Sequence, residues 1–462
     1  MKSLFLLLGP VAAGLVGIGA AAWGQTPEVA WTAAVGTLCA VWWISEAIPM
    51  AVTGIVPIAV LPMVGVLTTS QVGQAYGSPL ILLLLGGFML STAMEHSGAH
   101  RRLALGMVRL VGGGGGGRRL VFGFMVASAA LSMWISNTAT TLMLLPIALA
   151  VLERSDDPRL RQALLLSVAY AASIGGIGTP IGTPPNLVFM QVYKEQFGVE
   201  PTFVQWMQWS LPVALVMLPL AALWLTRGLK RGESLQLPEV GAWRPQEVRT
   251  LAVFGVTALL WVTRNEPWGG WSEYLKLEGA NDASVALLAV LAMFLIPSGS
   301  RDEEGRPIRL LNWEVVNRIP WNILLLYSGG MVLAKGFAES GLSTLIGDAL
   351  SGLGALPVYL IVAIICLMVT FLTEVTSNVA TTTLLMPVLA ALAVGVGIEP
   401  RLVMVPATLS ASFAFMLPVA TAPNAIVYGA GGVRPGAMAR EGLALNLLGV
   451  VVVTVLSGLL MR

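Results

Sequence analysis

The chain has 462 residues, of which 56% are apolar and only 11% are charged. Soluble domains carry roughly 25% charged residues, so the composition excludes a soluble enzyme, a nucleic-acid-binding protein and a disordered chain. It predicts an all-α protein that crosses the lipid bilayer several times. The net charge of +2 identifies no partner, because in membrane proteins the placement of charge matters more than its sum.

Apolar segments along the chain predict the membrane spans, because a helix needs about 20 apolar residues to cross the hydrocarbon core. Two stretches, 120–152 and 357–396, are too long for one span and have polar clusters in the middle. Each can form two spans or one re-entrant hairpin, and their short halves favour hairpins. Eleven single spans are expected at 3–23, 28–48, 50–66, 79–98, 163–195, 203–226, 247–264, 283–297, 321–341, 403–430 and 437–460.

The basic residues orient these spans. With the N-terminus in the cytoplasm, twenty of the 26 Lys and Arg fall on the inner side, as the positive-inside rule requires. The C-terminus is then outside, and the location is the cell inner (plasma) membrane. The first span, which follows Lys2, could also be a cleaved signal peptide, but a retained helix fits the charge bias better.

The sequence repeats itself in three blocks. Residues 136–146 (SNTATTLMLLP) and 377–387 (SNVATTTLLMP) are identical at seven of eleven positions, at an offset of 241. Residues 180–186 (PIGTPPN) and 418–424 (PVATAPN) share Pro, Thr, Pro and Asn at an offset of 238. Because the two Ser-Asn clusters enter from opposite sides, the halves are predicted to be inverted repeats, the architecture of secondary transporters. The upstream block repeats at an offset of 243, where Gly86, Gly87, Ser97 and Gly98 match Gly329, Gly330, Ser340 and Gly341.

The polar clusters predict binding sites inside the membrane. Pro180, Pro184 and Pro185 should interrupt one span, and Pro418 and Pro423 another. Each break frees carbonyl groups that suit Na⁺ and creates a helix N-terminus that suits an anion. Packing of small residues between helices explains single Ser or Thr residues, but not a repeated block. An ion and substrate site is therefore favoured.

Ionisable and sulfur-bearing residues are few in the spans. A structural role is expected for Glu46, whereas Glu374 could either tune or brace the second Ser-Asn cluster. Cys39 and Cys366 are expected to be buried free thiols, and His96 and His100 are too few for a zinc or haem site. No Arg or Lys falls near either cluster in the sequence, so neutral donors and bound cations are expected to hold an anion.

Together these residues resemble the divalent anion/sodium symporter family of dicarboxylate, citrate and sulfate transporters. The resemblance covers the whole chain. It rests on the segment 42–49 (WWISEAIP), on the paired signatures 136–138 (SNT) and 377–379 (SNV), and on 182–186 (GTPPN) and 420–424 (ATAPN).

The resemblance implies a homodimer that works by an elevator mechanism. Residues 1–119 and 229–356 would form the scaffold, with spans one to four and seven to nine. Residues 120–228 and 357–462 would form the transport domain, which carries the two hairpins and the other spans. The glycine run 112–117 would be a hinge or a merely tolerated loop.

The resemblance also assigns site residues. The first of two or more Na⁺ sites would use Ser132, Ser136, Asn137 and backbone near Gly182. The second would use Thr373, Asn378 and backbone near Thr376 and Ala420. A small di- or tricarboxylate would meet Asn137, Thr138, Thr183, Ser377, Asn378, Val379 and Thr421.

Two departures from the family pattern bear on specificity. Val379 replaces an expected Thr, and Ala422 replaces a Pro often found there. A site with one donor fewer should discriminate substrates differently. The function expected is Na⁺-coupled transport of succinate-like dicarboxylates, with Na⁺-independent exchange as the alternative. A channel or cation/proton antiporter is the hypothesis from another class, and a membrane-embedded enzyme is less favoured because no nucleophile–base pair is visible.

Overall fold

The computed structural model of the protein describes residues 2–112, 116–153, 155, 157–229, 241–265, 270–277 and 279–461. Within these ranges nearly all secondary structure is helical, which confirms the predicted all-α class. One two-stranded antiparallel hairpin, β1 (Pro297–Arg301) with β2 (Pro307–Arg309), was not expected. It lies in the predicted inner loop 298–320, where polar residues flank Gly305 at a φ of 77°.

The N-terminal helices form a layered group. α1 packs along α2, and a Cβ at Gly17 would lie 3.2 Å from that of Ala34. The stretch 50–66 is divided into two short helices at Gly54, whose backbone lies against Leu325 and Leu326. The helices here are α1 (Lys2–Ala22), α2 (Pro27–Ser45), α3 (Met50–Thr53), α4 (Ile55–Met63), α5 (Thr69–Tyr76), α6 (Pro79–Ser97) and α7 (Ala99–Gly112).

Both apolar stretches that exceed one span fold as helix pairs. The first gives α8 (Gly117–Ser132) and α9 (Asn137–Leu152), and the second gives α19 (Val358–Thr373) and α20 (Asn378–Val396). A helix of 16 residues, such as α8 or α9, is about 24 Å long, which is shorter than the roughly 30 Å hydrocarbon core. The lengths of α8 and α9 are those of a re-entrant hairpin, whereas α20 has 19 residues and is long enough to cross the membrane. Whether both pairs are re-entrant therefore stays a prediction.

Both proline-containing spans are interrupted where predicted. The first consists of α10 (Pro158–Gly176) and α11 (Pro184–Phe197), and the second of α21 (Arg401–Ala411) and α22 (Ala422–Gly429). The other helices are α12 (Phe203–Thr226), α13 (Pro245–Val262), α14 (Gly270–Tyr274), α15 (Asp282–Leu295), α16 (Trp313–Val316), α17 (Trp321–Glu339), α18 (Leu342–Leu350), the 3₁₀ helix η1 (Ser351–Ala355) and α23 (Pro435–Leu460).

In the described residues, six helical segments are long and apolar enough to cross a membrane alone. They are Leu4–Ala22, Pro27–Ser45, Thr69–Ser97, Phe203–Thr226, Asn378–Val396 and Pro435–Leu460. Several expected spans are shorter or interrupted, so the count of eleven stays a prediction.

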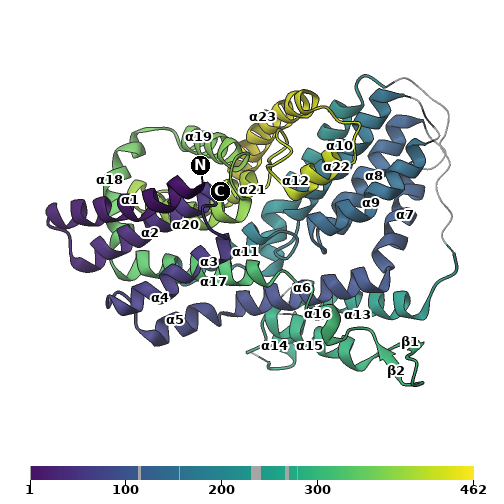
Figure 1. Ribbon diagram of the computed structural model, residues 1–462, viewed down its shortest axis with the longest axis horizontal. Helices are drawn as coiled ribbons and strands as arrows, with labels where there is room; N and C mark the ends of the chain where they lie inside the picture. Colours follow the sequence, from purple (N-terminus) through teal and green to yellow (C-terminus); the bar gives the residue numbers. More distant parts are fainter. Residues whose placement is uncertain are drawn as a thin grey trace.

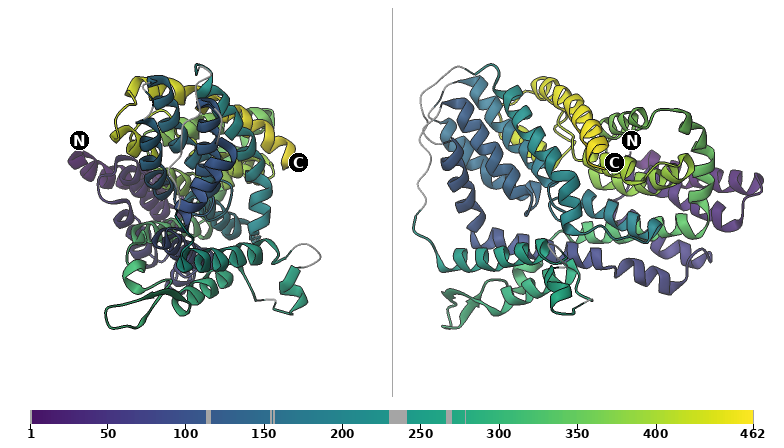
Figure 2. Two further views of the ribbon diagram at one scale, coloured as in Figure 1. Left: turned by 90° about the vertical axis from the view of Figure 1, so that its right-hand side faces the viewer. Right: turned by 180° about the vertical axis from the view of Figure 1, so that it is seen from behind.

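The helices are arranged around a central crossing (Figure 1). On one side lie α7–α10 with α12, and on the other lie α1, α2 and α18–α20, while α6 and α17 run below them and above α14–α16 and the β1–β2 hairpin. The view from behind in Figure 2 keeps this division. The first hairpin and the second hairpin therefore approach the centre of the molecule from different sides.

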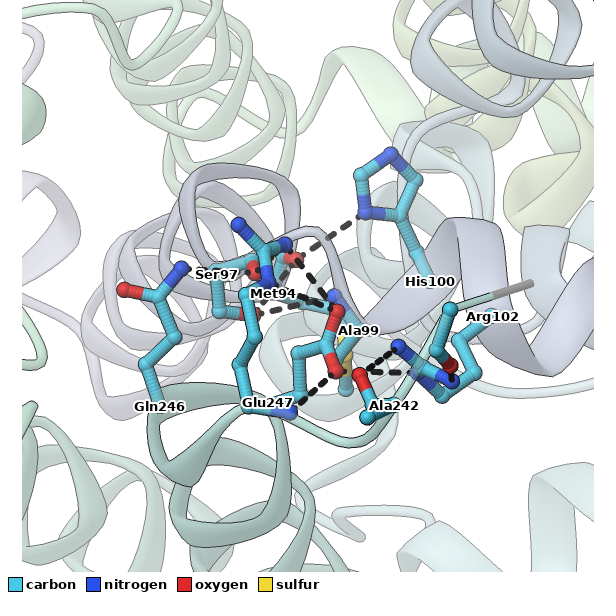
Figure 3. A network of polar contacts seen from close by, with 10 residues as sticks. Met94, Ser97, Ala99, His100, Arg102, Ala242, Gln246 and Glu247 are labelled. Atoms are coloured by element: carbon cyan, nitrogen blue, oxygen red, sulfur yellow. Dashed lines mark hydrogen bonds and ion pairs between the residues drawn. The ribbon is translucent and has the colours of Figure 1, made fainter.

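A polar network fixes the corner between α6 and α7 (Figure 3). Arg102 Nε donates to Glu247 Oε2 at 2.9 Å, and its other nitrogens donate to the carbonyl oxygens of Gly241 and Ala242. Arg244 also bonds Glu247 and the Ser97 carbonyl oxygen, at 3.0 Å each. These charge-assisted bonds attach the start of α13 to the segment that leads into the first hairpin.

Candidate functional site

The first hairpin turns at a Ser-Asn pair. Ser136 is the N-cap of α9 and accepts the backbone N–H of Ala139. Ser132 Oγ donates to Asn137 Oδ1 at 2.5 Å, and Thr141 Oγ1 donates to the Asn137 carbonyl oxygen at 2.8 Å. The Asn137 side chain is therefore held in one orientation at the tip of the hairpin.

The second hairpin repeats this geometry at positions that are 241 residues later. Thr373 Oγ1 donates to Asn378 Oδ1 at 2.7 Å, and Thr382 Oγ1 donates to the Asn378 carbonyl oxygen at 2.8 Å. Thr373 also reaches the Ala411 carbonyl oxygen at 3.0 Å, which ties the hairpin to the second broken span.

The two broken spans are held open by equivalent asparagines. Asn186 Nδ2 donates to the carbonyl oxygens of Gly176 at 3.0 Å and Thr179 at 2.7 Å. In the second span, 238 residues later, Asn424 Nδ2 donates to those of Ala414 at 2.9 Å and Leu417 at 3.0 Å. The sequence repeat is thus a structural repeat, since the same side chains make the same hydrogen bonds in both halves.

One cavity of about 780 Å³ lies where the hairpins and the breaks meet. All seven residues expected to meet the substrate line it, and so do six of the eight residues expected near Na⁺. The first set is Asn137, Thr138, Thr183, Ser377, Asn378, Val379 and Thr421, and the second is Ser136, Gly182, Thr376 and Ala420 with Asn137 and Asn378 shared. Segments that are distant in the sequence therefore share one site.

Ser132 and Thr373 do not line the cavity but lie directly behind it, fully buried. Around Ser132, a Cβ at Gly176 would lie 2.5 Å from Asn137 Oδ1. A Cβ at Gly182 would lie 3.0 Å from the Ser132 carbonyl oxygen and would collide with that of Gly176. Carbonyl, amide and hydroxyl oxygens thus converge beside two glycines, and this donor set fits a hard cation such as Na⁺.

The capping hydroxyls differ between the halves. Ser136 caps α9 whereas Thr183 makes no side-chain cap to α11. In the second half the roles are reversed, since Thr421 accepts the Asn424 N–H while Ser377 makes no cap to α20. One hydroxyl in each half, Thr183 and Ser377, therefore remains available to a ligand in the cavity.

Glu374 braces the second break. Its carboxylate accepts the backbone N–H groups of Met416 at 2.8 Å and Leu417 at 2.9 Å, and the Asn446 amide at 2.7 Å. Asn446 in turn accepts the Phe415 N–H at 3.2 Å. Of the two roles considered for Glu374, the structure supports bracing, because all of these partners belong to the broken span and α23.

Charged residues also line the cavity, and one of them is an Arg, although no Arg or Lys falls near either cluster in the sequence. Arg318 comes from the segment between α16 and α17, Glu95 from α6 and Glu46 from the end of α2. Glu46 has a left-handed φ of 47°, so it ends α2 as well as lining the cavity. Sequence reasoning missed Arg318 and Glu95 because each lies far along the chain from the Ser-Asn signatures, and it expected only a structural role for Glu46.

The described residues contain no group of three or more His, Cys, Asp or Glu that could hold a metal ion. The His100 imidazole instead contacts the Met94 carbonyl oxygen at 3.0 Å (Figure 3). Partial burial lowers the pKa of His100 below its usual value. Cys39 and Cys366 are buried free thiols, as predicted. Of the glycine run considered as a hinge, residues 113–115 lie outside the described residues.

Comparison with known proteins relates the chain to membrane transporters. The family model described as the sodium:sulfate symporter transmembrane region matches residues 6–461. The sodium-dependent dicarboxylate transporter SdcS of Staphylococcus saprophyticus is 38% identical, over 90% of this chain and 82% of its own. SdcS of Staphylococcus aureus strain USA300 is 37% identical with the same coverage.

Two solved structures share the fold. The YdaH transporter of Alcanivorax borkumensis superposes with a TM-score of 0.60 at 17% identity, over 87% of each chain. MtrF of Neisseria gonorrhoeae superposes with a TM-score of 0.57 at 13% identity, over 83% of this chain and 81% of its own. At these identities the likeness concerns the fold alone. The family match over nearly the whole chain and the close relatives show that the protein belongs to the divalent anion/sodium symporter family.

Proposed function

We propose that the protein is a secondary transporter that takes up C4 dicarboxylates together with Na⁺. The observation that carries this proposal is the single cavity lined by both Ser-Asn hairpin tips and both broken spans. Its volume of about 780 Å³ falls in the range of small-molecule sites. The relatives named above, which are called sodium-dependent dicarboxylate transporters, support the same substrate class.

The polar groups of the cavity suit a dianion. Amides of Asn137 and Asn378 and the uncapped hydroxyls of Thr183 and Ser377 can donate to carboxylate oxygens. Thr138 and Thr421 add hydroxyls, and Val379 contributes an apolar wall. We assign one carboxylate to each half, since the donors come in two sets.

Na⁺ would bind directly behind these donors. In the first half it would take oxygens of Ser132, Ser136 and Asn137 and the backbone near Gly182. In the second half it would take Thr373, Asn378 and the backbone near Thr376 and Ala420. Because Asn137 and Asn378 would serve both the ion and the anion, binding of Na⁺ would order the donors that the substrate needs.

Coupling to Na⁺ has an energetic reason. Moving one negative charge inward against an inside-negative potential costs about 2.3 kcal/mol per 100 mV, and a dianion costs roughly twice that. Three co-transported Na⁺ would make the cycle net positive, so that the potential would drive uptake. Two bound Na⁺ would only neutralise the substrate, and a third would have to bind elsewhere.

For the movement itself we propose an elevator cycle in a homodimer. Residues 120–228 and 357–462 would slide as the transport domain against the scaffold 1–119 and 229–356. The hairpins would be re-entrant and inverted in the plasma membrane, with the N-terminus inside and the C-terminus outside. The segments that line the cavity support this division, since hairpins and breaks form one wall and α2, α6 and α17 contribute to the other.

The test is uptake of radiolabelled succinate into proteoliposomes, with and without a Na⁺ gradient, and a counterflow panel of mono-, di- and tricarboxylates and sulfate. Symport predicts uptake that requires external Na⁺ and is accelerated by an inside-negative potential. Uptake that ignores Na⁺ but requires internal dicarboxylate would contradict it.

That last outcome would support dicarboxylate exchange, the second candidate. Arg318 in the cavity favours this candidate, because a fixed positive charge offsets part of an anion's charge without Na⁺. A cation/proton antiporter needs a titratable acid at the crossing, and Glu374 is occupied by its hydrogen bonds to the break. Na⁺-driven proton movement in the absence of any anion would support the cation/proton antiporter instead.

A further inference from the structure

Arg318 has a singular place in the cavity. Among the residues that the structure describes, it is the one Lys or Arg that lines the cavity. It follows α16 and precedes the N-cap of α17, and its side chain is exposed. The nearest basic residue before Arg318 in the sequence, Arg309 on β2, does not line the cavity. The guanidinium is therefore a cationic group in a cavity whose other polar lining residues are neutral side chains and two carboxylates, beside many apolar residues.

The start of α17 adds positive potential at the same end. This helix has 19 residues, and its N-cap Pro320 provides no side-chain hydrogen bond to the first turn. Pro320 and Ile323 line the cavity together with Arg318. The N-terminus of a helix carries roughly half a positive charge. A guanidinium and a helix N-terminus thus act on the same volume.

No described residue neutralises Arg318 by direct pairing. Glu46 and Glu95 also line the cavity, but none of the ion pairs between described residues includes Arg318. Because the Arg318 side chain is exposed and has no partner in these ion pairs, its guanidinium is accessible to a ligand in the cavity. A planar guanidinium matches the two oxygens of a carboxylate, so a ligand carboxylate is a suitable partner.

The second Ser-Asn signature supplies a reason for such a group. Thr138 gives the first signature a hydroxyl, whereas Val379 gives the second none, and both residues line the cavity. Val379 also shares an adjoining pocket with Ile323, in the first turn of α17. The second half, whose signature has Val379 in place of a hydroxyl donor, therefore lies beside the segment that carries Arg318.

We propose that Arg318, which belongs to the proposed scaffold, binds one carboxylate of the anion in the state of the transport cycle that this structure represents, and makes the site select dianions over monoanions. The inference rests on the proposed function, because it names how that site recognises its substrate. Charge-assisted hydrogen bonds contribute more than neutral ones. Loss of the guanidinium should therefore weaken dianion binding by about tenfold and monoanion binding much less.

The experiment compares R318Q and R318K with the parent protein in proteoliposomes, with R301Q as the matched control. Arg301 lies on β1 of the same loop, is exposed and does not line the cavity. In R318Q the KM for succinate should rise about tenfold while the maximal rate stays within about twofold. R318K should restore most of the affinity, and R301Q should match the parent. Adding V379T to R318Q should lower the KM again, because a hydroxyl returns to that half.

A second measurement separates this inference from the proposed function. Thermal stabilisation of the purified protein by succinate, sulfate and butyrate is recorded in Na⁺ for the parent and R318Q. If the parent fails to transport any dicarboxylate, the proposed function fails, yet loss of stabilisation by either dianion in R318Q still supports Arg318 as an anion ligand. Equal stabilisation and an unchanged KM in a folded R318Q, or equal losses for butyrate and the dianions, would overturn the inference.

Discussion

The two halves of the molecule make the same hydrogen bonds with different supporting residues. In both, a hydroxyl holds the asparagine at the hairpin tip, and a second asparagine holds the break. The first break is fully buried, whereas in the second Val419 is 82% exposed. The duplicated chemistry is therefore constant, and the packing around it is what distinguishes the halves.

The braces show this difference most clearly. In the first half, Trp206 Nε1 donates to the Ile177 carbonyl oxygen at 2.8 Å, and Thr179 donates to the Met133 carbonyl oxygen. In the second half, Glu374 and Asn446 bind three backbone N–H groups of the break. The side chains that support the second break accept from backbone N–H groups and leave the carbonyl oxygens there free. Those that support the first break donate to carbonyl oxygens and so occupy them. The two cation sites are thus expected to differ in affinity.

The largest effects are expected at the shared asparagines. Alanine at Asn137 or Asn378 removes the oxygen that Ser132 or Thr373 now binds and a group that lines the cavity. We expect Na⁺-dependent uptake to fall at least about 100-fold in either variant, with the protein still monodisperse in detergent. N317A, at an exposed position outside the cavity, is the control. Full activity in both variants would remove the site assignment.

Removing the brace tests whether the halves are supported differently. In E374Q, the amide has one oxygen that can accept, and its nitrogen only donates. It therefore cannot accept all the hydrogen bonds that the carboxylate accepts from Met416, Leu417 and Asn446. A buried N–H left without an acceptor costs about 1–3 kcal/mol, so the midpoint temperature of thermal unfolding should fall. Addition of Na⁺ should raise this midpoint less in E374Q than in the parent protein. M133L, at the equivalent position of the first half, should change neither. Equal behaviour of the two variants would mean that the brace does not support the break.

A glycine-to-alanine exchange probes the first cation site alone. A Cβ at Gly176 would lie 2.5 Å from Asn137 Oδ1, so G176A must displace that oxygen. We expect the Na⁺ concentration for half-maximal uptake to rise about tenfold. The second half already carries Ala414 at this position, and A414G should change Na⁺ dependence less than about threefold. A harmless G176A would show that the first asparagine does not bind the ion.

Much of the site could be predicted because the repeat marks it in the sequence. The match between 136–146 and 377–387 located both hairpin tips, and the prolines located both breaks. Glu95 on α6 and Arg318, in the segment before α17, reach the cavity only through tertiary packing, for which no local sequence pattern exists. The bracing role of Glu374 depends on Asn446, which lies 72 residues away, so its partners were invisible to sequence reasoning.

The smallest effect is expected from exchanging the hydroxyl that distinguishes the two signatures. V379T gives the second signature the Thr138 hydroxyl, and T138V removes it from the first. One neutral hydrogen bond contributes about 1 kcal/mol, so the preference for succinate over sulfate should shift about threefold to tenfold, in opposite directions in the two variants. Competition assays in proteoliposomes measure this shift. If both variants shift the preference in the same direction, the two halves do not hold separate carboxylates, and the assignment of one carboxylate to each half is wrong.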